Sequence, residues 1–163
     1  MGCHRLLTRQ ECGMNKRNWM KCTAALAFGL VAINPAWASE TPATLAGAKV
    51  IQADEAKKLL DAGVPFFDTR VAAEYAEKTI KGAKSLVYRE KSAKSADFDA
   101  GQDQFDLAKL PADKAAPVVF FCNAGTCWRS YKASAVAVKA GYTQVHWFRG
   151  GMPEWTAKGL PTQ

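Results

Sequence analysis

Residues 118–130 read VVFFCNAGTCWRS, and the alanine-rich segment YKASAVAVKA follows directly. The four apolar residues VVFF favour a buried strand that leads into Cys122. A loop with a glycine comes next, and Ser130 is expected to cap a helix over the alanine-rich segment. This order of strand, loop and helix directs the Cys122 thiol at a helix N-terminus.

A cysteine in this position is predicted to be a nucleophile. The first N–H groups of a helix lack intrahelical acceptors, and together with the helix dipole they favour an anion over its neutral acid. Arg129 lies in the same loop and favours the thiolate in the same way. We therefore expect Cys122 to be ionised near neutral pH, in preference to an inert buried thiol at a strand end.

The charge of the chain is unevenly distributed. Its 163 residues carry 22 Lys and Arg against 15 Asp and Glu, a net charge of +7. Residues 1–38 hold five of the basic residues and one of the acidic residues, so residues 39–163 have a net charge of only +3. This distribution gives no ground for a nucleic-acid partner.

The first 38 residues have the three parts of a secretory signal peptide. A basic segment precedes the apolar run CTAALAFGLVAI, and AWA at 36–38 forms a small-residue cleavage site. The basic segment has an ordinary length if translation starts at Met14, which we infer to be the true start. Cleavage after Ala38 leaves 125 residues in a single domain, with no stable membrane anchor. We therefore expect a periplasmic or secreted protein.

Cleavage also removes Cys3, Cys12 and Cys22, so that Cys122 and Cys127 are the only cysteines left, in a compartment where disulfides persist. With His146 as the only remaining histidine, these residues cannot complete a tetrahedral metal site in one chain. We therefore expect no metal and no cofactor. His146 lies within a predicted strand and is assigned a structural role.

The rest of the domain alternates short apolar runs with helical patterns. Strands are predicted at 50–51, 64–68, 85–88, 118–121 and 145–148. Helices are predicted at 55–62 with Asp54 as the cap, at 72–78 and around 104–109. This alternation is typical of an α/β fold whose central parallel five-stranded sheet is covered by helices on both faces. Ligands of such sheets bind beyond the carboxyl ends of the strands, where Cys122 is expected.

The segment 89–117 is polar and weakly patterned. The basic residues at 78–94 are expected to form a solvated face, in preference to a patch that steers anionic donors: Lys78, Lys81, Lys84, Arg89, Lys91 and Lys94. The acidic residues of 89–117 are expected to form a second solvated face. They are Asp97, Asp99, Asp103 and Asp106.

Three motifs in order resemble the signatures of the rhodanese-like (sulfurtransferase) family. The first consists of FDTR at 67–70, EY at 74–75 and IKGA at 80–83. The second is CNAG at 122–125, where the active-site loop of the family begins. The third consists of GYTQV at 141–145, RGGMPEW at 149–155 and GLP at 159–161. The resemblance spans nearly all of residues 39–163.

The resemblance implies a rhodanese-like fold and a catalytic cysteine that carries sulfane sulfur as a persulfide. The donor would be a small anion such as thiosulfate, or a persulfide, and the acceptor a thiol, cyanide or a protein cysteine. Cys122, Arg129 and Cys127 are the candidate catalytic residues. The remaining loop residues are assigned to substrate binding: Asn123, Ala124, Gly125, Thr126, Trp128 and Ser130. Asp68 and Arg70 are expected to form an ion pair that braces a strand end.

The chain departs from the family pattern at two places. Thr79 stands where the family usually has histidine, which we interpret as a structural change. The loop from Cys122 to Arg129 has six intervening residues and contains a second cysteine. Phosphatases related to rhodanese have the pattern C-x5-R, which differs from this loop by one residue, so phosphatase or arsenate-reductase chemistry is a minor alternative.

The role of Cys127 stays open at the level of sequence. It could resolve a persulfide on Cys122, carry the sulfur itself in a cysteine-tryptophan variant of the loop, or form a structural disulfide, since a curled loop could bring residues five apart within bonding distance. Two other functions are therefore considered beside sulfur transfer. One is a thiol-disulfide redox module that uses both cysteines, and the other is a non-catalytic domain that binds an anion.

Overall fold

The structure, a computed structural model, describes residues 39–163. The signal peptide predicted for residues 1–38 and the start inferred at Met14 lie outside the described residues. No helix within the described part of the chain is long and apolar enough to cross a membrane.

Five parallel strands form one central sheet in the order β1-β5-β4-β2-β3. The strands are β1 (Ala48–Ile51), β2 (Phe66–Asp68), β3 (Lys84–Ser85), β4 (Val118–Phe121) and β5 (Val145–Phe148). The helices are α1 (Ala53–Asp61), α2 (Ala72–Glu77), α3 (Trp128–Lys139) and α4 (Gly151–Ala157). Short 3-10 turns occur at η1 (Ala100–Gln102), η2 (Leu107–Lys109) and η3 (Ala124–Thr126). The predicted α/β class and the parallel five-stranded sheet are confirmed.

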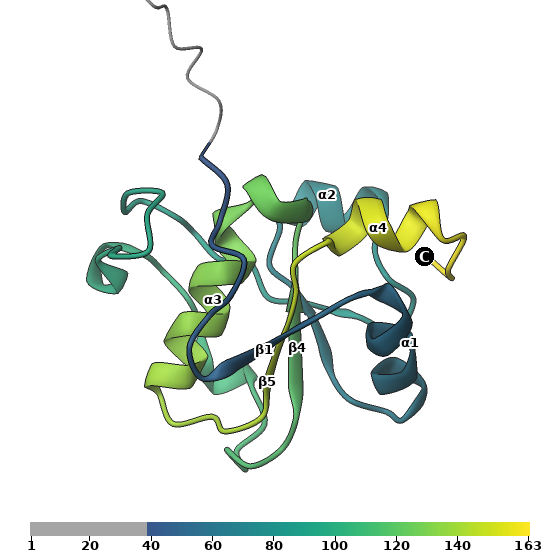
Figure 1. Ribbon diagram of the computed structural model, residues 1–163, viewed down its shortest axis with the longest axis horizontal. Helices are drawn as coiled ribbons and strands as arrows, with labels where there is room; N and C mark the ends of the chain where they lie inside the picture. The colour runs from purple at the N-terminus through teal and green to yellow at the C-terminus, as the bar shows by residue number, and fades with distance from the viewer. Residues whose placement is uncertain (1–38) are drawn as a thin grey trace, which may run out of the picture. The chain divides into compact units, whose positions relative to one another are not determined.

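Helices cover both faces of the sheet, as Figure 1 shows with α3 on one side and α1 and α4 on the other. Alternate residues of β4 explain this arrangement, because successive side chains of a strand point to opposite faces. Val118 and Phe120 pack with α3, whereas Val119 and Phe121 pack with α1 and α4. All four side chains are fully buried. The continuous apolar run VVFF is thus explained by burial on both faces.

The strands predicted at 118–121 and 145–148 have the observed bounds, but the edge strand is shorter than predicted. β3 contains only Lys84 and Ser85, although the N–H groups of Leu86 and Tyr88 still donate to the carbonyls of Asp68 and Thr69. Backbone hydrogen bonds to the β2 side therefore continue past the end of β3, but they do not form a regular β-ladder. The predicted helix at 104–109 is reduced to the single turn of η2.

Two predicted helix caps are wrong. Gln52, and not Asp54, is the N-cap of α1, and the free N–H of Ala53 donates to Glu154 Oε1 at 2.7 Å. A side chain from a distant helix thus replaces the local cap. Cys127 is the N-cap of α3, so Ser130 lies inside the first turn of that helix. Local sequence propensities predict neither of these two N-cap positions.

A buried lysine anchors the segment between β3 and β4. Lys132 of α3 is fully buried, and its Nζ lies 2.7 Å from Glu90 Oε1 and donates to Ser92 Oγ at 2.8 Å. The Asp103 side chain accepts hydrogen bonds from Ser92 and from the hydroxyl of Tyr88. The Asp103 side chain is 1% exposed, so the prediction of a solvated carboxylate is wrong for this member of the acidic set. The expected solvation holds for Asp97, Asp99 and Asp106, which are exposed.

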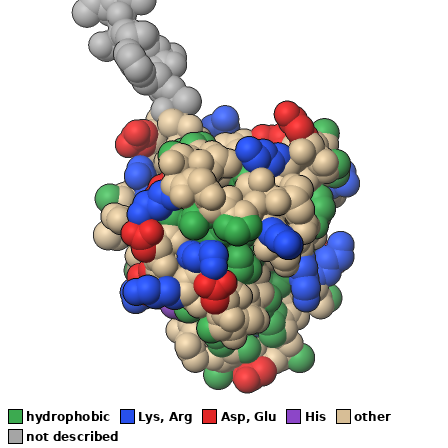
Figure 2. Space-filling view, turned by 90° about the vertical axis from the view of Figure 1, so that its right-hand side faces the viewer, with side chains coloured by type: hydrophobic (Ala, Val, Ile, Leu, Met, Phe, Trp, Pro, Cys, Tyr) green, Lys and Arg blue, Asp and Glu red, His purple; other side chains and the backbone are tan. Residues whose placement is uncertain are grey.

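The surface on the α1 and α4 side carries mixed charge. Figure 2 shows Lys and Arg side chains interspersed with Asp and Glu and with hydrophobic side chains, and not gathered in one patch. Ion pairs such as Lys57 with Asp61 and Lys158 with Asp54 contribute to this pattern. This face has no single-sign patch of the kind that binds nucleic acid.

Candidate active site

Cys122 lies directly after β4, the strand between β2 and β5. It is 1% exposed, and its carbonyl accepts a hydrogen bond from the N–H of Met152 at 2.9 Å. The backbone of Gly151 comes so close that a Cβ there would lie 2.1 Å from the Cys122 carbonyl oxygen, and Gly151 has φ +55°. Only glycine fits at this position, and the start of α4 is thereby packed against the strand end.

Cys127 forms a disulfide with Cys122, with the two Cα atoms 6.2 Å apart. The loop curls through η3, where Ala124 has φ 55° and the N–H of Cys127 donates to the Ala124 carbonyl at 3.1 Å. A curled loop that brings the two cysteines together was one of the possibilities left open by the sequence. The two cysteines are within bonding distance, and Cys127 is also the N-cap of the 12-residue helix α3.

The chain from Ser39 to Thr41, which we call the N-terminal strap, lies across this loop. The N–H and the Oγ1 of Thr41 both donate to the Gly125 carbonyl at 2.7 Å. The Ser39 carbonyl accepts from Trp128 Nε1 at 2.8 Å. Thr41 is only 3% exposed. The strap therefore contacts both the loop and the start of α3.

Arg149 connects the strap to the sheet. Its guanidinium donates to the carbonyl of Thr41 at 2.9 Å and to Thr41 Oγ1 at 3.2 Å, and it pairs with Glu40 at 3.4 Å. The sequence interpretation missed Thr41 and Arg149 as parts of the site. Arg149 begins the RGGMPEW motif, which could have indicated its importance, whereas no sequence signal marked Thr41.

Arg129 forms an ion pair with Glu74 at the edge of the loop. Its Nη1 donates to Glu74 Oε2 at 3.1 Å, and Asn123 Nδ2 donates to the other carboxylate oxygen. Burial acts to raise the pKa of Glu74, but the hydrogen bonds from Asn123 and Arg129 outweigh it and hold this pKa below its usual value. Glu74 belongs to the EY motif at 74–75, but no site role was predicted for it from the sequence. A role of Arg129 toward a bound persulfide stays a prediction.

Asp68 and Arg70 form an ion pair at the end of β2, with 2.7 Å between Asp68 Oδ2 and Arg70 Nη2. Asp68 is fully buried and also accepts from Thr79 Oγ1 at 2.8 Å. Thr79 stands where the family that the sequence resembles usually has histidine. Its hydroxyl thus donates a hydrogen bond to the carboxylate of the Asp68–Arg70 pair. Arg70 Nη1 lies 3.5 Å from Asn123 Oδ1, which brings the ion pair next to the cysteine loop.

Two of the predicted substrate-binding residues have side chains turned into the protein. Ser130 is 1% exposed, and its Oγ accepts from Trp147 Nε1 at 3.0 Å. Trp128 is 4% exposed and packs edge-on against Tyr131. The structure brings Asn123 and Gly125 together with the cysteines, whereas the side chains of Trp128 and Ser130 serve packing. Thr126 is exposed.

A hollow of about 300 Å³ opens beside the loop. Its lining comes from the ends of β2 and β4 and from α2 and α4: Arg70, Glu74, Glu77, Lys78, Asn123, Met152, Pro153 and Thr156. Both signs of charge are present in it. The hollow therefore adjoins the cysteine loop at the carboxyl ends of the strands, where α/β sheets bind ligands.

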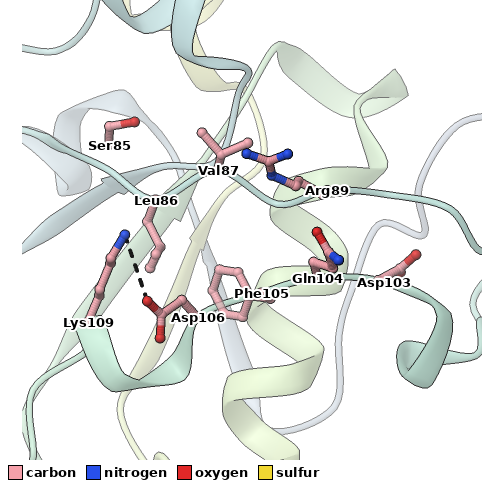
Figure 3. A pocket seen from close by; sticks show the side chains of 9 residues that line it. All are labelled: Ser85, Leu86, Val87, Arg89, Asp103, Gln104, Phe105, Asp106 and Lys109. Carbon is pink, nitrogen blue, oxygen red and sulfur yellow. Dashed lines mark ion pairs between the residues drawn. The ribbon is translucent and has the colours of Figure 1, made fainter.

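A larger hollow of about 540 Å³ lies between segments 85–89 and 103–109. Figure 3 shows the Asp106–Lys109 ion pair at one end and Arg89 with Gln104 at the other. No residue of the cysteine loop lines it. This hollow is therefore separate from the candidate active site.

His146 lies in β5, with its Nδ1 buried and without a hydrogen-bond partner among the described residues. Burial lowers its pKa. The charged groups that act on this pKa are those of Glu55 and Lys49, and neither belongs to the cysteine loop. These contacts agree with a structural assignment for His146.

The parallel sheet, the cysteine at its carboxyl edge and the loop before α3 define a class of α/β domain with a cysteine loop at the carboxyl ends of its strands. Residues 52–158 match the rhodanese-like domain family, and the chain belongs to that family. No curated protein sequence matches the chain.

Solved structures with similar folds include several sulfurtransferases. A human single-domain sulfurtransferase is 27% identical with a TM-score of 0.51, over 69% of this chain and 98% of that chain. A polysulfide-sulfur transferase homodimer from Wolinella succinogenes is 24% identical with a TM-score of 0.52, over 72% and 80% of the two chains. A thiosulfate sulfurtransferase from Pseudomonas aeruginosa is 23% identical with a TM-score of 0.52, over 71% of this chain but 20% of that chain. The last two similarities establish the fold alone.

Proposed function

We propose that the protein is a sulfurtransferase that carries sulfane sulfur as a persulfide on Cys122. The observation that supports this most directly is the position of Cys122, between the end of β4 and the loop that precedes α3. Membership of the rhodanese-like family and the similarity to the human single-domain sulfurtransferase support the same class of reaction.

The reaction begins after a reductant opens the Cys122–Cys127 disulfide, because a sulfur in a disulfide is not a nucleophile. The Cys122 thiolate then attacks the outer sulfur of thiosulfate. The S–S bond of thiosulfate breaks, sulfite leaves with the electron pair, and Cys122 becomes a persulfide anion. A persulfide donor would react in the same way and release a thiol.

The loop and the start of α3 stabilise this anion. The first N–H groups of α3 have no intrahelical acceptor, and the positive end of the helix dipole lies at Cys127. Arg129 follows within the first turn and adds positive charge, which Glu74 partly offsets. In this proposal the loop amides carry most of the stabilisation and Arg129 contributes less.

The second half of the reaction transfers the outer sulfur to a thiophilic acceptor. Attack by cyanide yields thiocyanate, and attack by a low-molecular-weight thiol or a protein cysteine yields a new persulfide. Each attack returns the Cys122 thiolate. The proposed setting is the periplasm or the extracellular space, where an exported chain beginning at Ser39 would meet such donors and acceptors.

A thiol-disulfide redox module is the second candidate, and the Cys122–Cys127 disulfide favours it. In that function the pair alternates between dithiol and disulfide and exchanges electrons with another thiol pair. No sulfur is then gained by the protein.

The intact mass of the reduced protein after thiosulfate treatment distinguishes these functions. The reductant is removed before thiosulfate is added, and a parallel sample receives no thiosulfate. A gain of one sulfur that cyanide removes as thiocyanate is expected for sulfur transfer. A loss of two hydrogens only after a low-molecular-weight disulfide is added as the oxidant, with no sulfur gained from thiosulfate and no hydrosulfide released, is expected for the redox module. Thiosulfate binding with an unchanged mass would indicate a non-catalytic anion-binding domain.

A further inference from the structure

The two sulfur-bearing residues of the disulfide differ in their access to solvent. Cys122 is 1% exposed and continues directly from the fully buried Phe121. Cys127 is partly exposed and follows the exposed Thr126. Cys127 is therefore the more accessible residue of the disulfide and the side from which a reactant in solvent would approach it.

The chemistry of disulfides makes this difference important. A nucleophile attacks one sulfur and expels the other, and accessibility helps to decide which sulfur is attacked. Attack at Cys122 would require an approach through buried surroundings. Attack at Cys127 takes place from the solvent side and expels the Cys122 sulfur as the leaving thiolate.

The surroundings of Cys127 favour an anionic nucleophile. Cys127 is the N-cap of the 12-residue helix α3, whose positive dipole end attracts an anion and stabilises a thiolate at the loop. Two carboxylates beside the loop, those of Glu74 and Glu40, are each paired with an arginine. Their repulsion of an approaching anion is reduced by this pairing.

We propose that the oxidised protein has a further activity, in which hydrosulfide attacks the Cys127 sulfur and is oxidised to a persulfide. A bond forms between the hydrosulfide sulfur and Cys127 Sγ, and the Cys122–Cys127 bond breaks. Its electron pair goes to Cys122 Sγ, which takes up a proton. The sulfide sulfur is oxidised to sulfane sulfur, and the disulfide is reduced to one thiol and one persulfide.

Hydrosulfide is distinguished from other thiols by its product. An organic thiol would leave a mixed disulfide, whereas hydrosulfide leaves a persulfide that can be passed to the acceptors of the proposed sulfurtransferase. The inference rests on the proposed function in this last step only. After transfer, a low-molecular-weight or protein disulfide restores the Cys122–Cys127 disulfide by thiol-disulfide exchange.

The test compares the oxidised and the fully reduced forms of the exported protein, residues 39–163, in which Cys122 and Cys127 are the only cysteines. Each form is treated with isotopically labelled sulfide in the absence of oxygen. Samples are quenched at early times with an alkylating reagent, and mass spectrometry of intact protein and peptides locates the label. We expect one labelled sulfur per chain in the oxidised protein, attached to Cys127, and none in the reduced protein, which holds no electron acceptor. Cys127→Ser, which cannot form the disulfide, is the matched variant and should gain no label.

Three results would overturn the inference: no label in the oxidised protein, label on Cys122 from the earliest time, or equal labelling of the reduced protein. Thiosulfate loading of the reduced protein is measured separately. If thiosulfate loading fails while the sulfide label appears on Cys127, the proposed thiosulfate reaction is wrong and the sulfide reaction stands. If only the sulfide label fails, the sulfurtransferase proposal is unaffected.

Discussion

The guanidinium group of Arg149 lies directly against Gly125, at the centre of the loop between the two cysteines. A Cβ at Gly125 would be 2.8 Å from Arg149 Cζ and 2.8 Å from Nη2. The same guanidinium is held by Thr41, which also donates two hydrogen bonds to the Gly125 carbonyl. The conformation of the loop thus depends on residues about 84 positions before it and about 24 positions after it.

Gly125→Ala should reduce sulfur transfer without unfolding the protein. The added methyl group must displace the guanidinium of Arg149, and we expect the hydrogen bonds of that group to Thr41 of the N-terminal strap to be lost, which leaves the loop less well held. We expect kcat/KM for thiosulfate to fall by about 10- to 100-fold, the scale of a small misplacement in an active site. Steady-state kinetics and thermal unfolding provide the measurements. Gly101→Ala, a change at an exposed turn, is the control, and equal activity of both variants would contradict the role of this contact.

Cys122→Ser should abolish persulfide formation from thiosulfate and leave the fold intact. A serine hydroxyl does not ionise at this position and cannot hold a persulfide, while its volume is close to that of the thiol. The expected result is no gain of sulfur by intact mass, with an unchanged circular dichroism spectrum. Near-normal turnover by this variant would transfer the thiosulfate-reactive role to Cys127.

Arg129→Ala should retain residual activity. Its side chain is paired with Glu74, and the amides of the loop and of α3 remain in place to hold the anion. We expect a decrease of about tenfold in kcat/KM, equivalent to about 1.4 kcal/mol. Glu74→Gln is the matched variant, because it removes the partner charge and leaves Arg129 free to act on an anion. A complete loss of activity in Arg129→Ala would mean that the guanidinium, and not the amides, holds the persulfide.

Acid should destabilise the protein through Asp103. Burial acts to raise the pKa of this carboxyl, but hydrogen bonds from Ser92, Lys91 and Tyr88 outweigh it and hold the pKa well below its usual value. Because the folded-state pKa lies below the unfolded one, the contribution is fully present above about pH 4 and is lost as the pH falls toward the folded-state pKa.

Asp103→Asn tests this dependence by urea unfolding at several pH values. Asp103 Oδ2 lies 3.7 Å from Lys132 Nζ, and both side chains are buried. At neutral pH we expect a loss of about 3–5 kcal/mol, the scale for removing one partner of a buried ion pair. The difference from the wild type should shrink as the pH falls below about 4. Asp106→Asn, at an exposed carboxylate, is the control and should change stability little. A difference that stays constant with pH would show that the ionisation of Asp103 is not involved.

The exported protein should begin at Ser39. The three-part leader and the AWA site predict cleavage after Ala38. N-terminal sequencing of protein from the periplasm or the medium is the measurement. Recovery of the uncleaved chain from the cytoplasm alone would refute the prediction, and would remove the basis for an oxidising environment around Cys122 and Cys127.

Much of the central sheet could be predicted because its strands are local signals. Val118–Phe121 is a short apolar run between a proline and a cysteine, and Val145–Phe148 lies between polar residues on both sides, with a glycine pair one residue further on. Burial on both faces makes such runs continuous and easy to detect. The edge strand was harder, because β3 is paired on one side only and two of its predicted residues make contacts outside a regular ladder.

The structure of the segment 89–117 could not be predicted from the sequence, because a side chain of another element, α3, holds this segment in place. Lys132 looks like an ordinary residue of an alanine-rich helix, and Asp103 like one of several acidic residues. Their burial together with Glu90, Ser92 and Tyr88 depends on how this segment packs against α3. A polar cluster of this kind leaves no periodic pattern in the sequence.

The sequence by itself determined the α/β class, the position of Cys122 at a strand end and the presence of a second thiol five residues later, because these features depend on local propensity and spacing. Only the tertiary structure decided that the two cysteines are bonded, that Cys127 is the more accessible of them, and that Thr41, Glu74 and Arg149 surround the loop. The physical reason is that residues far apart in the sequence fix the loop. A loop of this length has many conformations of similar energy, and hydrogen bonds from distant segments select one of them.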